Sequence, residues 1–218
     1  AFRSHGWFVR LDASPLGFGS IAAHGHCDAL HLSVWDSNYA LLIDPGTGSY
    51  YGNVELRDEL ARWNAHNGPQ PVDKPFETPR RHGPFLQLIH HQTPTLVTEG
   101  TSAIARFEHE NHAFQRHVLW NGESIEIRDA EDLQKPFSIH WWLAPECNLE
   151  DQLSIKPGRF IIHRNDLRWE LFMDAPGATY SIITRRVSPN YGKIQESKVI
   201  VVSGIQSGIA TRLRRIST

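Results

Sequence analysis

The chain has 218 residues, of which 40% are hydrophobic and 21% charged, and this composition excludes an extensively disordered protein. The formal net charge of -2 gives no overall attraction to nucleic acid. No apolar run reaches the about 18 residues of a membrane span, and the first residues lack the apolar stretch of a signal peptide. We therefore expect one soluble domain over residues 1–218, with neither nucleic acid nor membrane as a partner.

Short segments of alternating or β-branched residues recur along the whole chain. Turn residues, such as Asn121-Gly122 and Pro157-Gly158, separate many of them, and this alternation is typical of antiparallel sheets. The sequence therefore predicts an all-β, antiparallel fold. The predicted strands cover residues 30–35, 39–43, 85–90, 103–107, 115–120, 124–129, 138–143, 160–164, 168–173, 178–184 and 198–202.

Only one segment has helical character. In residues 54–63, Leu56, Leu60 and Trp63 recur at spacings of four and three, with no internal proline, which predicts one short helix. Residues 68–84 contain five prolines and are expected to form a long loop. The two cysteines, Cys27 and Cys147, do not require a disulfide in a chain of this length, and we expect both to be free.

Three histidines and one aspartate form a candidate metal site. His24 and His26 are two residues apart, so an extended backbone directs both side chains to the same face. Asp44 ends an apolar strand, where an unpaired carboxylate is costly, and His66 follows the predicted helix. Imidazole and carboxylate ligands suit zinc or another divalent cation, and three protein ligands would leave one position open.

Each of these residues also has a purely structural interpretation. A histidine is usually a surface residue or a hydrogen-bonded core residue, and Asp44 could simply introduce the turn at Pro45-Gly46. A simple hairpin turning at Ser37 would also leave Asp44 about 13 Å from His26. The metal site therefore requires residues 23–28 to curl back as a loop, which Gly25 permits.

Three ordered blocks of sequence resemble the C-terminal domain of heparinase II/III-like polysaccharide lyases. They are S-P-L-G at residues 14–17 leading to H-G-H-C-D-A-L at 24–30, then L-L-I-D-P-G-T-G-S-Y at 41–50, and A-H-N at 65–67. Weaker similarity continues at residues 83–85, 141–145 and 188–192, so the resemblance covers nearly the whole chain.

The resemblance implies a stacked antiparallel β-sandwich that holds one divalent ion per chain, usually zinc, through His26, Asp44 and His66. It also implies that His24 faces the sugar. Family members cleave uronate-containing polysaccharides by β-elimination: the carboxylate is neutralised, a base removes the C5 proton, and an acid assists loss of the 4-linked oxygen. His24 is the candidate for the carboxylate contact or the proton transfer, since imidazole titrates near neutrality.

Further residues are candidates for substrate binding. Tyr50 and Tyr51 could contact sugar, although tyrosines at a strand end more often pack in an aromatic cluster. Arg57 could pair with a carboxylate or sulfate, and Arg62, Arg80 and Arg81 could attract an anionic chain. Solvated surface charge is the alternative explanation for each arginine.

The resemblance also suggests what this chain lacks. Family lyases carry a helical toroid domain before the β domain, and the toroid supplies catalytic residues across the cleft. No such region occurs in these 218 residues, so we expect the β half of a lyase, incomplete for catalysis alone and belonging to a periplasmic or secreted parent. The alternative is a non-catalytic, carbohydrate-binding or structural sandwich with a structural metal. A cupin is disfavoured because its glutamate after the H-x-H pair is absent.

Overall fold

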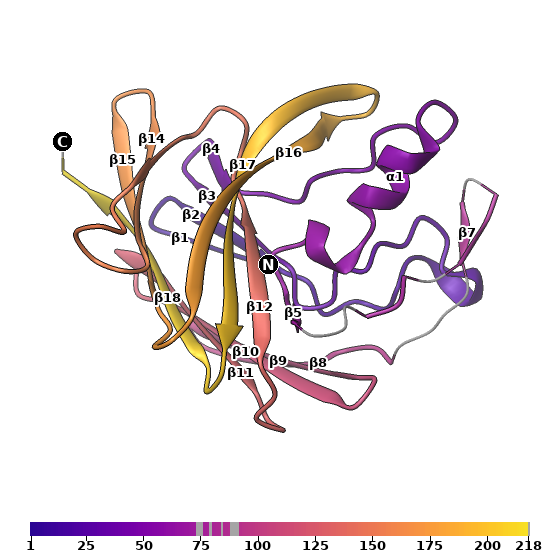
Figure 1. The fold of residues 1–218 in the computed structure, drawn as a ribbon, viewed down its shortest axis with the longest axis horizontal. Coiled ribbons are helices and arrows are strands. Elements are labelled where there is room, and N and C mark those ends of the chain that lie inside the picture. Colours follow the sequence, from indigo (N-terminus) through magenta and orange to yellow (C-terminus); the bar gives the residue numbers. More distant parts are fainter. Residues whose placement is uncertain (73–75, 79, 84, 88–91, 218) are drawn as a thin grey trace.

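A computed structural model describes residues 1–72, 76–78, 80–83, 85–87 and 92–217, and Figure 1 shows its β architecture. The first sheet contains four antiparallel strands from the N-terminal part of the chain. In spatial order these are β1 (Phe2–Ser4), β2 (Trp7–Leu11), β3 (Leu32–Asp36) and β4 (Tyr39–Leu42). A bulge between Val34 and Trp35 shifts the pairing of β3 with β4 by one residue.

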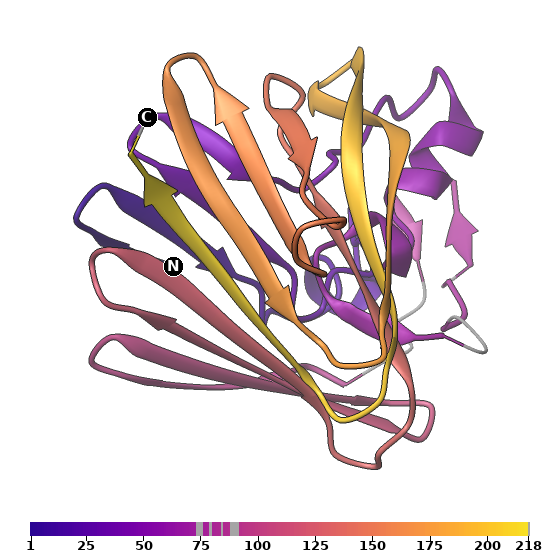
Figure 2. The same ribbon diagram turned by 60° about the vertical axis from the view of Figure 1, so that its left-hand side comes forward.

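An eight-stranded antiparallel sheet forms the largest layer, and Figure 2 shows its long strands fanned across the molecule. Its strands in spatial order are β13 (Asn148–Asp151), β14 (Arg159–Arg164), β15 (Leu167–Asp174), β18 (Ile209–Ile216), β11 (Ser124–Glu131), β10 (His112–Trp120), β9 (Ser102–His109) and β8 (Thr95–Glu99). In β18 the buried residues Ile209, Thr211 and Leu213 alternate with exposed ones, so one face of the strand lies on the core.

A third sheet of four strands completes the packed structure. Its order is β16 (Thr179–Asn190), β17 (Lys193–Ile205), β12 (Phe137–Trp142) and β5 (Pro69–Pro71). A separate two-stranded ribbon pairs β6 (Arg81–His82) with β7 (Leu86–Gln87). A bridge between Leu42 and Leu143 connects the first sheet to the third.

One hydrophobic core joins the three sheets. It contains Leu42 from the first sheet, Phe114 and Leu213 from the second, and Ile139 and Val202 from the third, all buried. Burial of apolar side chains between facing sheets is the main stabilising term of such a fold. The predicted antiparallel β-sandwich is therefore confirmed.

The one α-helix in the described part of the chain is shorter than its hydrophobic pattern predicted. Helix α1 (Val54–Leu60) begins at Asn53, whose side-chain Oδ1 accepts a hydrogen bond from the Leu56 N–H at 2.9 Å. The chain then leaves the helix, and Trp63 opens a separate 3-10 turn, Trp63–Ala65. Another 3-10 turn covers Gly19–Ile21.

Several strands were not predicted from the sequence. They include β1, β2, β8, β13 and β18, and the expected long loop at 68–84 contains the short strands β5 and β6. The predicted strand at 85–90 is observed at Leu86–Gln87, and its last three residues lie outside the described part of the chain. Cys27 and Cys147 are both free and buried, as expected. Within the described residues, no helix is long and apolar enough to cross a membrane.

Candidate metal centre and adjoining cavity

The loop that carries His24 and His26 lies between β2 and β3 and curls back, as the metal hypothesis requires. The His24 N–H donates to the Phe85 carbonyl at 2.9 Å, and the Cys27 N–H donates to the Ala61 carbonyl at the end of α1, also at 2.9 Å. These bonds attach the loop to two neighbouring segments.

Gly25 is needed in this loop for space rather than for an unusual backbone angle. Its neighbour His24 has a left-handed backbone, with φ of 59°, whereas Gly25 does not. A Cβ at Gly25 would lie 2.3 Å from the Gln87 side-chain nitrogen and 3.0 Å from the Gly17 backbone nitrogen. The prediction that Gly25 permits the curl is correct in outcome, but its physical reason is close packing.

His26, Asp44 and His66 converge in the structure. One ligand atom from each lies within 4.8 Å of the others. The His26 Nδ1 is 3.4 Å from the His66 Nε2, which is 3.6 Å from the Asp44 Oδ2. Ligand atoms of a tetrahedral zinc site with bonds of about 2.0–2.1 Å lie about 3.3 Å apart, so the spacing fits a shared cation.

Hydrogen bonds on the outer side of each group direct the candidate ligand atoms inward. The His66 Nδ1–H donates to the Arg62 carbonyl at 2.9 Å, and the Gly46 N–H donates to the Asp44 Oδ1 at 2.8 Å. The other nitrogen of His26, Nε2, is 3.4 Å from the Thr47 hydroxyl. Such outer partners orient metal-binding imidazoles and carboxylates and select their tautomers.

The two facing ring nitrogens can share either a proton or a cation. The His66 Nδ1–H donates to the Arg62 carbonyl, so the His66 Nε2 presents a lone pair toward the His26 Nδ1, 3.4 Å away. Where the His26 Nε2 carries the proton, toward the Thr47 hydroxyl, the His26 Nδ1 presents a lone pair as well, and a cation between the two nitrogens would satisfy both. The donor set therefore fits a divalent cation.

Burial favours the uncharged imidazoles that a metal needs. Burial and the adjacent His66 lower the pKa of His26 to about 3, and burial also lowers the pKa of His66. Burial raises the pKa of Asp44, but the surrounding imidazoles, His66 foremost, and the Gly46 N–H outweigh it and hold that pKa below its usual range. Two neutral imidazoles and one carboxylate are therefore available at neutral pH.

Asn67 and His31 form a buried framework behind the centre. The Asn67 side-chain amide donates to the Leu32 and Ile43 carbonyls, and its Oδ1 accepts from the Trp142 N–H at 2.7 Å. The Asn67 N–H donates to the His31 Nδ1 at 3.0 Å, so His31 carries its proton on Nε2, which contacts the Ser33 hydroxyl at 2.7 Å. Burial lowers the pKa of His31 to about 3, consistent with this neutral tautomer.

A cavity of about 390 Å³ opens beside the metal candidates. Its lining includes His24, His26 and Asp44, together with Asp28 and Thr47. Burial and the nearby carboxylates of Asp12 and Asp44 raise the pKa of Asp28 well above its usual value. The exposed His24 imidazole and the candidate ligands His26 and Asp44 therefore line one cavity.

His24 is the exposed histidine of this cavity, and aromatic rings surround it. Its Nδ1 is 2.9 Å from the Tyr50 hydroxyl, and its ring lies 4.9 Å from that of Phe85. Tyr50 also packs at 5.0 Å against Phe85 and at 5.5 Å against Tyr191, whose hydroxyl accepts from the Tyr50 N–H. The contact on Nδ1 leaves Nε2 of His24 as the atom available to a ligand.

The two other predicted substrate-binding residues occupy different environments. Tyr51 is 74% exposed and lies 6.0 Å from the Phe85 ring. Arg57 is only 2% exposed, and its guanidinium lies 5.0 Å from the Tyr50 ring centroid. The structure thus brings Tyr51 to the surface and buries Arg57 beneath Tyr50, which favours a supporting role for Arg57 over direct contact with a polysaccharide.

Sequence reasoning missed four residues of this region: Asp28, Thr47, Phe85 and Tyr191. Asp28 and Thr47 stand inside the conspicuous blocks at 24–30 and 41–50, so their positions in those blocks are a usable signal. Phe85 and Tyr191 come from segments 83–85 and 188–192, whose similarity to the family was noted without a role. Their approach to His24 depends on tertiary structure.

Comparisons with known proteins bear on the family and the fold of the chain. A sequence profile of the protein family described as heparinase II/III-like, C-terminal, matches residues 1–214. A comparison with curated proteins gave no match.

Solved structures share the fold. A heparinase III described as the BT4657 gene product, with methylated lysines, aligns with a TM-score of 0.76 and 16% identity over 100% of this chain and 35% of its own. The heparan sulfate lyase HepC from Pedobacter heparinus aligns with a TM-score of 0.73 and 15% identity, over 96% and 33%. A further structure titled heparinase III gives 0.66 and 14%, over 92% and 31%. This chain therefore spans about a third of the length of these proteins.

Proposed function

Because the chain belongs to the heparinase II/III-like family through its C-terminal domain, we propose that it forms one wall of the active site of a polysaccharide lyase. The single observation that carries the proposal is the convergence of His26, Asp44 and His66 beside the exposed His24 in one cavity. The proposed substrate is an anionic, uronate-containing polysaccharide such as a glycosaminoglycan. The proposed reaction is β-elimination.

His26, Asp44 and His66 would hold zinc or another divalent cation, one per chain. A bound cation would supply positive charge close to the cavity and would fix the loop that carries His24. The spacing of the three ligand atoms and their outer hydrogen bonds support this assignment.

His24 is the proposed catalytic residue of this wall. Elimination requires neutralisation of the uronate carboxylate and removal of the C5 proton, and an imidazole can hydrogen-bond the first or accept the second. Where the His24 Nδ1–H donates to the Tyr50 hydroxyl, Nε2 carries the lone pair and can accept a proton. Tyr50 would then position His24, and the exposed Tyr51, beside Phe85, would contact sugar.

The remaining parts of the proposal concern the parent protein. A helical toroid domain would supply the opposite wall of the cleft, including the other acid or base. A protein that degrades extracellular polysaccharide is proposed to function in the periplasm or after secretion. The match of the whole chain to a C-terminal family domain, and to about a third of the length of a heparinase III, supports the first point.

Elemental analysis of the purified chain tests the metal centre. We expect about one divalent ion per chain, and loss of that ion in His26→Ala but not in the control His163→Ala. His163 is a suitable control because it pairs with Glu150 on a different sheet. Absence of any bound ion in the purified chain, after exposure to zinc, would refute the site.

Activity is tested in the full-length protein that carries this domain. Heparan sulfate and other uronate polymers should yield the ultraviolet absorbance of an unsaturated uronate, and His24→Ala should lower turnover by about 10²–10⁴-fold with metal content unchanged. Absence of absorbance from every uronate polymer would refute the lyase. Full activity in His24→Ala would instead favour a binding or structural sandwich in which the metal only stabilises loops.

A further inference from the structure

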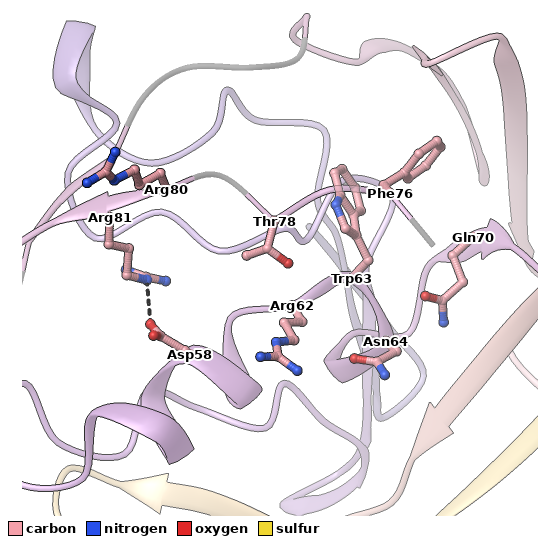
Figure 3. A pocket seen from close by; sticks show the side chains of 9 residues that line it. All are labelled: Asp58, Arg62, Trp63, Asn64, Gln70, Phe76, Thr78, Arg80 and Arg81. Atoms are coloured by element: carbon pink, nitrogen blue, oxygen red, sulfur yellow. Dashed lines mark ion pairs between the residues drawn. The ribbon is translucent and has the colours of Figure 1, made fainter. Parts of the chain in front are cut away.

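A second cavity, of about 630 Å³, lies apart from the one that contains His24. The two cavities share no lining residue, although they are connected through the backbone. The Arg62 carbonyl accepts the hydrogen bond of His66, whereas the Arg62 side chain lines the second cavity. Figure 3 shows this cavity, which is lined by Asp58, Arg62, Trp63, Asn64, Gln70, Phe76, Thr78, Arg80 and Arg81.

One end of the cavity is strongly cationic. In Figure 3, Arg80 and Arg81 lie on the same side as Asp58, with Arg62 between them and the opposite end. Three guanidinium groups and one carboxylate give a local formal charge of +2. Arg81 is already engaged, since its Nε lies 3.1 Å from the Asp58 Oδ1 and its Nη2 donates to the Gly25 carbonyl at 3.1 Å.

Arg62 and Arg80 differ from Arg81 in their interactions. Both are exposed, and among the residues that the structure describes neither has an ion-pair partner. A guanidinium presents a planar fork of donors that matches the oxygen pairs of a carboxylate or sulfate. Two unpaired guanidiniums at one cavity therefore provide a place for an anionic group.

The other end of the cavity offers amide donors and an apolar wall. Gln70 is 3% exposed, and its Nε2 has no hydrogen-bond partner within the described structure. A buried amide without a partner is costly, so rotation of this covered amide toward a ligand oxygen in the cavity would be favoured. Asn64 is exposed beside it, and the rings of Trp63 and Phe76 pack 5.0 Å apart to form the wall.

We infer that this cavity binds an acidic sugar unit of the polysaccharide, at a position separate from the proposed catalytic centre. The carboxylate or sulfate would pair with Arg62 and Arg80, and the hydroxyl groups would accept or donate hydrogen bonds at Gln70 and Asn64. The volume lies within the about 300–1,000 Å³ usual for ligand cavities. The identity of the ligand rests on the proposed function, whereas the cationic cavity does not.

Calorimetric titration of the chain with a heparan sulfate tetrasaccharide tests the inference. The His24→Ala background excludes cleavage during the titration. Arg62→Ala and Arg80→Ala should each raise the Kd by about tenfold, because each removes a charge-assisted contact. Arg128→Ala is the matched control, since Arg128 is an exposed arginine on the eight-stranded sheet, and it should leave the Kd within about twofold.

Gln70→Ala adds a test of the amide end and should raise the Kd by about threefold. Inorganic sulfate is titrated in parallel. The inference would be overturned if the tetrasaccharide bound with equal affinity to the chain that carries only His24→Ala and to both arginine variants made in that background. The inference would also be overturned if inorganic sulfate bound through Arg62 and Arg80 while tetrasaccharide binding did not change in Arg62→Ala or Arg80→Ala.

The full-length protein separates this inference from the proposed function. If it is a lyase, Arg62→Ala and Arg80→Ala should raise KM with kcat unchanged, because the cavity does not contain the reacting atoms. If no polymer is cleaved but tetrasaccharide binding still depends on both arginines, the lyase proposal fails and the cavity assignment stands. A fall in kcat alone, with KM and Kd unchanged, would contradict the assignment.

Discussion

Asn67, the residue after the candidate ligand His66, shows how one side chain can fix several segments. It is fully buried and bonds to β3, to the end of β4 and to β12, and its carbonyl accepts from Arg116. Arg116 in turn pairs with Asp129 through two hydrogen bonds of 2.6 and 3.0 Å. The backbone of His66 is therefore held by the first, second and third sheets together.

Asn67→Ala should destabilise the chain by about 3–5 kcal/mol, because it leaves three buried backbone groups without partners at about 1–3 kcal/mol each, with partial compensation by water. Urea unfolding measures the loss. The control is Asn64→Ala, whose removed side chain is exposed, and it should change the free energy of unfolding by less than about 0.5 kcal/mol. Similar effects of the two substitutions would show that the Asn67 contacts contribute little.

The hydrogen bonds of Glu170 predict that the folded chain loses stability in acid, independently of the metal centre. Glu170 is 5% exposed and accepts hydrogen bonds of 2.7 Å from Arg159 and Arg214. Burial raises its pKa, but the two arginines outweigh burial and the pKa lies below the usual value of 4.5. A carboxyl with a lowered folded pKa stabilises the protein above its unfolded pKa, and this contribution is lost as the pH falls through the folded pKa.

Glu170→Gln should therefore destabilise the chain by about 2 kcal/mol at neutral pH and should lose less stability than the parent on acidification below about pH 4.5. Melting temperatures measured from neutral to acidic pH provide the comparison. The exposed Glu123 gives the control Glu123→Gln, which should keep the parent's acid profile. Parallel acid profiles for the parent and Glu170→Gln would rule this explanation out.

At the scale of elements, the tip of the β16–β17 hairpin supports the loop that follows Asp44. The Ser188 N–H donates to the Pro45 carbonyl at 2.6 Å, and the Gly192 N–H donates to the Gly48 carbonyl at 2.9 Å. In Figure 1 this hairpin curves over the sandwich toward α1. The two hydrogen bonds place its tip against the loop that follows Asp44. A strand pair from the end of the chain thus positions a ligand from its beginning.

Gly46→Ala tests this support. Gly46 and Gly177 both have φ of 80°, but a Cβ at Gly46 would lie 2.0 Å from the Ser188 carbonyl oxygen, whereas a Cβ at Gly177 would meet nothing within 4 Å. Both substitutions carry backbone strain of about 1–2 kcal/mol. Only Gly46→Ala should also separate the hairpin from the loop and reduce bound zinc, measured per chain by elemental analysis. Equal metal content in Gly46→Ala and Gly177→Ala would contradict the supporting role.

At the scale of the whole molecule, the three candidate ligands come from three separate segments: the loop before β3, the turn after β4, and the residue after the second 3-10 turn. A shared cation would therefore cross-link residues distant in sequence. Because such an ion binds only the folded chain, it stabilises that chain by about 2.7 kcal/mol at a free concentration 100 times its Kd.

Chelation should accordingly lower the melting temperature of the parent chain. His26→Ala should show a lower melting temperature that chelator does not change, because its ligand set is already broken. His163→Ala should respond to chelator as the parent does. A parent melting temperature that is unaffected by chelator, in a chain shown to contain metal, would exclude a stabilising role for the ion.

Local sequence signals mark the candidate ligands more clearly than they mark some of the strands around them. The spacing of His24 and His26, and the position of Asp44 after an apolar strand, are local signals, and the structure brings His26, Asp44 and His66 together. Strand β18 was missed although it lies inside the largest sheet, because one of its three buried alternating positions is the polar Thr211, which weakens the apolar pattern. The sequence predicts a helix that extends to Trp63, because this apolar residue follows Leu60 at a helical spacing. A separate 3-10 turn buries Trp63 instead.

The aromatic surroundings of His24 could not be predicted from local pattern. Phe85 and Tyr191 lie 61 and 167 residues after His24 in the sequence and reach it through a backbone bond to the loop and through the β16–β17 hairpin. No periodicity relates positions so far apart, since their approach depends on how the sheets pack. The second cavity has the same origin, because its lining residues enclose one space only in the folded chain.

The candidate metal ligands precede in the sequence the residues that hold their loops in place, and this order has a consequence for biosynthesis. His26, Asp44 and His66 leave the ribosome before Trp142 and Ser188, which hold their loops in place. The nascent chain therefore has metal-binding side chains long before it has a metal-binding geometry. Stable capture of an ion is expected only once translation has passed the β16–β17 hairpin.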